Sequence, residues 1–250
     1  KFTQKSELIK DWCREAKGKS IEIYTPLIKS RRKELIEMAE KNLEEDIKKN
    51  MQSDYKLDKG LKDLKEILNL RELPVRIECF DISNIQGKDA VGSMSVAING
   101  KTTPREYRKF KIKTKDTPDD FEMMREVLHR RYGKLKIDEM PDLILIDGGK
   151  GQLSAAEEIL LAEGKLQYTT LISIAKKEEL VFKSGEEIPY VINNKDESLK
   201  ILQRVRDEAH RFGITYHRKL RSKRVIKSEI DSIDGIGEKR RAVLLQRFGS

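Results

Sequence analysis

The chain has 250 residues, of which 38% are charged and 37% hydrophobic, so it can bury one substantial core beneath a heavily charged surface. No apolar run approaches 18 residues, which excludes a transmembrane helix. No signal peptide is visible. The formal net charge of +9 favours an anionic partner, most commonly a nucleic acid. The two cysteines lack a CxxC spacing, which argues against a zinc site and fits a reducing, cytoplasmic compartment. Because the first residue is Lys1 rather than Met, we expect a piece of a longer protein.

Residues 1–72 are predicted to be a mixed, mainly helical lead-in of unknown role. The expected elements are a helix at 7–16 that ends at Gly18, a strand at 20–25, a long helix that follows Ser30 and a second helix at 58–69. The long helix carries an apolar stripe made of Leu35, Met38, Ala39, Leu43 and Ile47. We find no catalytic constellation in this part.

Residues 73–226 predict a mixed sheet with flanking helices. Three strands at 75–82, 91–98 and 107–113 read as an antiparallel meander, with Asn99-Gly100 as a hairpin signal. A helix follows to Tyr132, with Thr117 as its cap and Phe121, Met124, Val127 and Leu128 inward. The remaining elements are strands at 143–146 and 170–175, a helix at 152–162, a hairpin at 180–191 and a helix at 197–218. This order is that of the ribonuclease H architecture, an α/β fold.

Two aspartates end strands that this topology makes neighbours. Asp81 lies near the end of the first strand, and Asp147 follows the apolar run 143–146. We expect their carboxylates within about 4–7 Å of each other, where they would repel strongly unless a divalent cation lies between them. Taken singly, each could be an ordinary polar residue at a strand end. The pair predicts a site for Mg²⁺ or Mn²⁺.

The turn Gly148–Gly151 follows Asp147 directly. Its glycines could simply provide the backbone freedom of a strand–helix turn. Alternatively, Lys150 and the turn amides bind a phosphate beside the metal, although the turn is too short for a Walker loop.

The last helix supplies a third group. At 100° per residue, its apolar face consists of Leu202, Val205, Ala209 and Phe212, and a polar flank beside it holds Gln203, Arg206, His210 and His217. His210 is the preferred candidate because it lies in the middle of the helix, whereas Glu208 points about 160° away from it. A histidine on such a flank could also be merely exposed or hydrogen-bonded.

The basic run 217–224 and the tail 227–250 are predicted to contact DNA. A solvated helix end would explain the run equally well, but His217, Arg218, Lys219, Arg221 and Arg224, together with Arg206, could bind phosphates. The tail has the form of a helix-hairpin-helix motif, with a short helix at 229–233. Its candidate phosphate ligands are the turn glycines and the cations that follow them, namely Gly235, Gly237, Lys239 and Arg240. A purely structural helical hairpin is the alternative.

Five segments resemble the UvrC family, the incision subunits of the bacterial UvrABC excision-repair system. They are ECFDISNIQG, DDFEMMREVLHRRYGK, PDLILIDGGKGQL, RVRDEAHRFGITYHRKLRSK and IDGIGEKRRAVLLQRFGS, which begin at residues 78, 119, 141, 204 and 233. The resemblance covers about residues 20–250. It implies a ribonuclease H-like, metal-dependent endonuclease that makes the 5′ incision at damaged double-stranded DNA, in complex with UvrB.

By motif position, the resemblance implies that Asp81, Asp147 and His210 carry the catalysis, with Asp120 as a weaker candidate. It also implies that the family's 3′ nuclease, its UvrB-binding segment and its second helix-hairpin-helix motif lie outside this chain. Two other classes of function stay open. A catalytically silent DNA-binding scaffold would account for the charge but not for the aspartate pair, and a nucleotide-dependent phosphotransferase would lack its phosphate loop.

Overall fold

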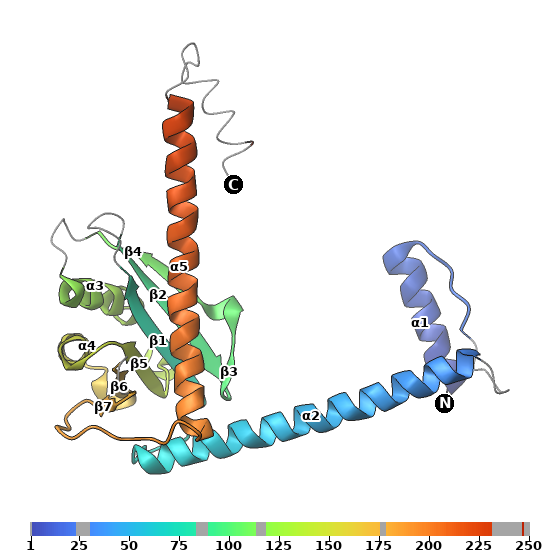
Figure 1. The fold of residues 1–250 in the computed structure, drawn as a ribbon, viewed down its shortest axis with the longest axis horizontal. Helices are drawn as coiled ribbons and strands as arrows, with labels where there is room; N and C mark the ends of the chain where they lie inside the picture. The colour runs from blue at the N-terminus through green and yellow to red at the C-terminus, as the bar shows by residue number, and fades with distance from the viewer. Residues whose placement is uncertain are drawn as a thin grey trace. The chain divides into compact units, whose positions relative to one another are not determined.

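The computed structural model describes residues 2–23, 31–83, 90–113, 119–175, 179–231 and 247 (Figure 1), with the side chains of the last helix described up to Thr215. The chain divides into two compact units, Lys1–Ser53 and Asp54–Ser250. Among the described residues, no helix combines the length and the apolar character that crossing a membrane requires.

The first unit contains α1 (Phe2–Lys17) and most of α2 (Arg31–Ile67). The helix predicted at 7–16 is confirmed, and Gly18 ends it with φ of +61°. Residues 20–23 form no regular element, so the predicted strand is wrong there. A strand needs a partner to complete its hydrogen bonds, and the described part of this unit offers none.

A single helix, α2, replaces the two helices that were predicted between residues 31 and 69. The sequence contains no proline in this range and no glycine before Gly60, so nothing interrupts the backbone hydrogen bonds. The side chains of the predicted apolar stripe, such as Leu35, Met38 and Leu43, are about 60% exposed. Further along α2 the environment changes, and Leu57, Leu61 and Leu64, followed by Leu68 just after the helix, enter the core of the second unit.

The second unit is built on one mixed sheet with the strand order β3-β2-β1-β5-β6-β7, in which β4 also pairs with β2. The central strands β1 (Arg76–Ser83), β5 (Leu143–Asp147) and β6 (Thr170–Ile174) are parallel. The outer strands β2 (Val91–Ile98), β3 (Lys101–Thr102), β4 (Arg108–Lys111) and β7 (Val181–Lys183) pair antiparallel. The predicted mixed sheet with flanking helices is therefore confirmed.

Alternate residues of the central strands enter two separate cores. Ile77, Cys79 and Leu145 pack with α5 (Glu197–Asp231) and the end of α2. Phe80 and Ile146 pack instead with α3 (Asp120–Tyr132) and α4 (Lys150–Ala162), and Figure 1 shows α5 apart from this helix pair. Strands buried on both faces are expected to be apolar throughout, as the run 143–146 is.

Several local predictions need correction. The third strand of the meander, predicted at 107–113, is confirmed as β4 but is shorter, and it is preceded by β3 and by the short helix η1 (Pro104–Glu106), which were not predicted. The cap of α3 is Asp119, whose carboxylate accepts hydrogen bonds from Phe121 N and Glu122 N, and Thr117 lies outside the described residues. Phe121 is 45% exposed rather than inward, and Leu161 of α4 is also exposed.

The later elements differ mainly in length. Helix α4 begins at Lys150, so only Gly148 and Gly149 form the turn. The hairpin predicted at 180–191 is reduced to β7 and a single bridge between Val181 and Tyr190. Helix α5 continues to Asp231 without a break, and it therefore includes the start of the short helix predicted at 229–233. The described part of the unit also contains two short helices, η2 (Ile137–Glu139) and η3 (Leu166–Tyr168).

Candidate metal centre

Asp81 and Asp147 come together because their strands are parallel neighbours in register. Phe80 of β1 pairs with Ile146 of β5, so the two aspartates directly follow a matched pair. Since Phe80 and Ile146 face the α3 and α4 side, the next residue on each strand faces α5. Both aspartates are almost completely buried, with 2% and 4% of their surfaces exposed. The predicted adjacency of these two strands is confirmed.

His210 reaches the same place from α5. Its Nδ1 lies 3.2 Å from Asp81 Oδ2, and its side chain is 49% exposed. Asp81, Asp147 and His210 each offer one ligand atom, and these atoms all lie within 4.8 Å of one another. The structure thus brings the three residues together as the sequence predicted, and they form the only such cluster in the part of the chain that it describes.

The donor set fits a hard divalent cation. Mg²⁺ and Mn²⁺ prefer carboxylate oxygens and accept an imidazole nitrogen, and the three residues present both. Two buried carboxylates side by side are costly without a positive charge between them. Burial, and then the charges of Asp147 and Asp81, raise the pKa of the Cys79 thiol beneath them well above its ordinary value. The electrostatics of the buried site therefore favour a cation.

The helical-face argument also holds for the neighbours of His210. Leu202, Val205 and Ala209 are fully buried, as predicted. Glu208 lies on another side of the helix, where it accepts a hydrogen bond from the Tyr107 hydroxyl at 3.0 Å. Burial and this hydrogen bond raise the pKa of Tyr107 to about 12. Glu208 is not part of the metal-ligand cluster.

Two predicted phosphate ligands have partners within the protein. The Arg206 guanidinium makes hydrogen bonds to both carboxylate oxygens of Glu179, at 3.0 and 2.9 Å, and also to Asp207. The Lys150 ammonium donates to the Glu187 carbonyl at 3.0 Å and lies 5.1 Å from the centre of the Phe182 ring. A phosphate would have to compete with these contacts, so both roles stay predictions.

Asp120 is the first residue of α3 and lies outside the three-residue cluster. It lines an open cavity of about 690 Å³ together with Asp119, Phe121, Gly149, Gly151 and Gln152. The cavity joins the start of α3 to the turn that follows Asp147. No feature of the sequence pointed to it, because Phe121 was read as a core residue.

The remaining candidates cannot be compared with the structure. His217, Arg218, Lys219, Arg221 and Arg224 belong to α5, but their side chains lie outside the described residues. Gly235, Gly237, Lys239 and Arg240 are also outside the described residues.

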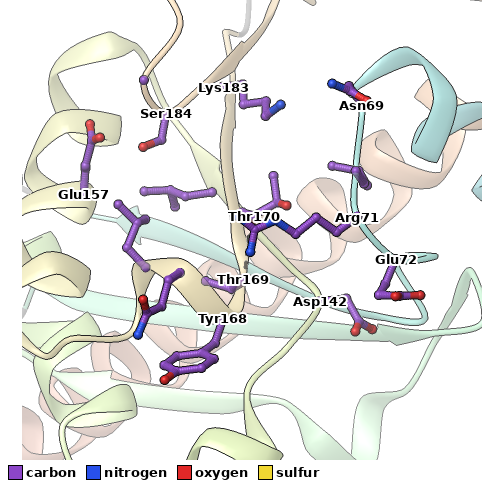
Figure 2. Close-up of a pocket in the computed structure, with 15 residues that line it drawn as sticks. Asn69, Arg71, Glu72, Asp142, Glu157, Tyr168, Thr169, Thr170, Lys183 and Ser184 are labelled. Atoms are coloured by element: carbon purple, nitrogen blue, oxygen red, sulfur yellow. Dashed lines mark hydrogen bonds between the residues drawn. The ribbon is translucent and has the colours of Figure 1, made fainter.

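A second cavity, of about 470 Å³, lies at the opposite end of the parallel strands, where β5 and β6 begin (Figure 2). Its lining includes Arg71, Asp142, Thr170 and Lys183. Asp142 precedes β5 and Asp147 ends it, so about 16 Å of extended strand separates this cavity from the candidate metal centre. The two sites are therefore distinct.

Comparison with known proteins identifies the family. Residues 65–214 match the UvrC RNAse H endonuclease domain. The chain is 61% identical over 233 residues to UvrABC system protein C of Fusobacterium nucleatum, covering 93% of this chain and 40% of that protein. The protein of the same name from Dictyoglomus thermophilum is 41% identical over 250 residues, covering 100% of this chain and 41% of that protein.

A solved structure of Ciona intestinalis endonuclease V in complex with inosine-containing DNA has a TM-score of 0.36 and 14% identity, covering 64% of this chain and 96% of that one. The chain spans about two fifths of the length of the curated relatives it matches. The predicted ribonuclease H-like fold and the resemblance of the sequence motifs are both confirmed. The chain belongs to the UvrC family, which it represents through the RNAse H endonuclease domain.

Proposed function

We propose that this chain hydrolyses a DNA phosphodiester bond with Mg²⁺ or Mn²⁺ held by Asp81 and Asp147 and with His210 acting beside them, and that this reaction is the 5′ incision of bacterial nucleotide excision repair. The observation that carries the proposal is the cluster of these three side chains, whose ligand atoms lie within 4.8 Å of one another at the end of two parallel strands. A silent DNA-binding scaffold would have no use for two buried neighbouring carboxylates.

The two aspartates would bind the ion and fix its position. They follow Phe80 and Ile146, which are fully buried, so their backbone positions are fixed by the core rather than by a loop. When bound, the divalent ion supplies a water of lowered pKa and offsets the charge that develops on the phosphate.

His210 has the role of a proton carrier in this proposal. In this proposal the Asp81 carboxylate is ionised, and His210 Nδ1 donates a hydrogen bond to it across the 3.2 Å contact. Nε2 is then left to take up a proton and return it to the leaving oxygen. Half of the side chain is exposed, which gives a substrate access to it. Direct ligation of the ion by His210 is the alternative, and the two roles differ in their effect on metal affinity.

The proposed substrate is damaged double-stranded DNA presented by UvrB in the bacterial cytoplasm. The net charge of +9 and the basic run 217–224 support an anionic partner. The basic run and the tail glycines would contact the backbone of the duplex without reading its sequence.

The test is the replacement of Asp81 or Asp147 by Asn in the full-length protein, with incision measured on a single-lesion duplex in the presence of its partner proteins. Each variant should lose about 10²–10⁴-fold in the rate of 5′ incision and should bind Mn²⁺ more weakly. Asp138→Asn changes an exposed carboxylate of η2 and serves as the control for charge. Normal 5′ incision by both site variants would refute the proposal.

A further inference from the structure

Two serines of β2 are buried between the sheet and α5, and their hydroxyls bind the helix backbone. Ser93 Oγ donates to the Ala209 carbonyl at 2.9 Å, and Ser95 Oγ donates to the Val205 carbonyl at 2.6 Å. Both residues are completely buried. Two residues of a strand span about 6.8 Å and one turn of four residues along a helix spans about 6.0 Å, so the two spacings match. The pair therefore fixes how far α5 is shifted along β2.

Ser93 has a second contact that Ser95 lacks. It lies directly opposite Asp81 in the antiparallel pair of β1 and β2, and its Oγ is 3.3 Å from the Asp81 carbonyl. Its other partner, Ala209, immediately precedes His210. One hydroxyl thus contacts both the carbonyl of Asp81 and the carbonyl of the residue that precedes His210.

The backbone of α5 does not need this hydroxyl. Within a helix, the carbonyl of Ala209 already accepts the hydrogen bond of the fourth residue onward, so an alanine at position 93 would leave no carbonyl without a donor. The serine instead fixes the position of α5 relative to β1 and β2. The contact from His210 Nδ1 to Asp81 Oδ2 measures 3.2 Å, and a displacement of α5 by about 1 Å would take it beyond hydrogen-bonding distance.

We propose that Ser93 is a positioning residue of the metal centre, whose hydroxyl holds α5 against β1 so that His210 meets Asp81. The inference rests on the proposed function, because it assigns Ser93 a role only if Asp81 and Asp147 bind an ion and His210 orients Asp81. It differs from a purely structural role, since Ser95 makes an equivalent bond one turn away from the site, to the carbonyl of Val205, which is not a site residue.

The test compares Ser93→Ala with Ser95→Ala in the full chain, with Mn²⁺ affinity measured by titration calorimetry and thermal stability measured alongside. Both variants should lose a similar, small amount of thermal stability, because each loses one buried hydrogen bond. Only Ser93→Ala should bind Mn²⁺ more weakly, by about 10–100-fold, as is usual when a residue that orients ligands is removed. Ser93→Cys keeps the shape with a much weaker donor, and it replaces the alanine variant if that one does not fold.

The outcomes separate the two proposals. If the wild type binds Mn²⁺ and both serine variants bind it equally well, the role of Ser93 is refuted while the proposed function stands. If Ser95→Ala weakens Mn²⁺ binding as much as Ser93→Ala, the effect is general loosening of α5 and the inference is also refuted. If the wild type binds no Mn²⁺ and Asp81→Asn incises normally, the proposed function fails and this inference fails with it.

Discussion

Strand β1 buries two acids on its two faces, Glu78 and Asp81, and their surroundings are opposite in kind. Glu78 accepts hydrogen bonds from the guanidinium groups of Arg76 and Arg131, at 2.8 and 2.6 Å, and from the Tyr132 hydroxyl at 2.9 Å. Asp81 instead lies beside a second buried acid, Asp147, and a half-exposed histidine.

The difference separates an acid that serves the fold from one that serves a site. Burial alone would raise the pKa of Glu78, but the hydrogen bonds and charges of Arg131 and Arg76 lower it below its ordinary value. The protein therefore supplies its own compensating charge for Glu78. Around Asp81 the second acid adds negative charge, which a bound cation would compensate.

The largest expected effect is a loss of incision rate when His210 of the candidate metal centre is replaced. In the full-length protein with its partners, His210→Ala should lower the rate of 5′ incision by about 10²–10⁴-fold while DNA affinity is largely kept, because a proton carrier acts on the barrier. His217→Ala, seven residues further along α5, should cost little rate. The 3′ incision should survive both changes and reports on folding. Loss of 5′ incision in His217→Ala with normal incision in His210→Ala would reverse the assignment.

The next largest effect is expected for Glu78→Gln, and it should appear in the stability of the fold rather than in the rate of incision. Glu78→Gln leaves the nearly buried Arg131 guanidinium without its carboxylate and removes one of the two carboxylates that pair with Arg76, so it should lower the free energy of unfolding by about 3–5 kcal/mol. Asp81→Asn removes one of two neighbouring acids and, in metal-free buffer, should leave stability unchanged or slightly higher. Urea unfolding of both variants with EDTA measures this. If both substitutions destabilise the protein equally, the distinction between Glu78 as an acid of the fold and Asp81 as an acid of the metal centre is wrong.

The smallest expected effect is the pH dependence of the stability that Glu78 contributes to the fold. Because its pKa is lower in the folded protein than the ordinary value of about 4.3, its ion pairs stabilise the fold above that value. This stability is lost as the pH falls through the lowered value. The difference in unfolding free energy between wild type and Glu78→Gln should therefore be constant near neutral pH and shrink in acid. If the difference is the same at pH 7 and pH 3, the ion pairs of Glu78 with Arg76 and Arg131 do not stabilise the fold as described.

The parts of the site that the sequence predicted depend on local patterns. An apolar run that ends in Asp147 marks a buried strand, and 100° periodicity was enough to choose His210 over Glu208. The hairpin at Asn99-Gly100 is likewise local, and both residues adopt positive φ, of 51° and 72°.

The parts that it missed depend on contacts between distant residues. Ser93 looks like an ordinary strand residue until α5 lies over it, 116 residues later in the chain. Glu78 finds Arg131 on a helix 53 residues away. The single helix α2 was predicted as two helices, each with its own apolar stripe, although no proline separates them.

Helix α5 extends well past the sheet (Figure 1), and its length can be expressed in base pairs. Residues 217–224 follow His210 by 7 to 14 positions, or about 10–21 Å of helix axis, which equals three to six base pairs of duplex DNA. If the metal centre holds the scissile phosphate and α5 runs along the duplex, the basic run would meet the duplex at that distance from the cut. One residue inserted between them would turn the run by about 100° around the axis, so the helix sets both the spacing and the direction of this contact.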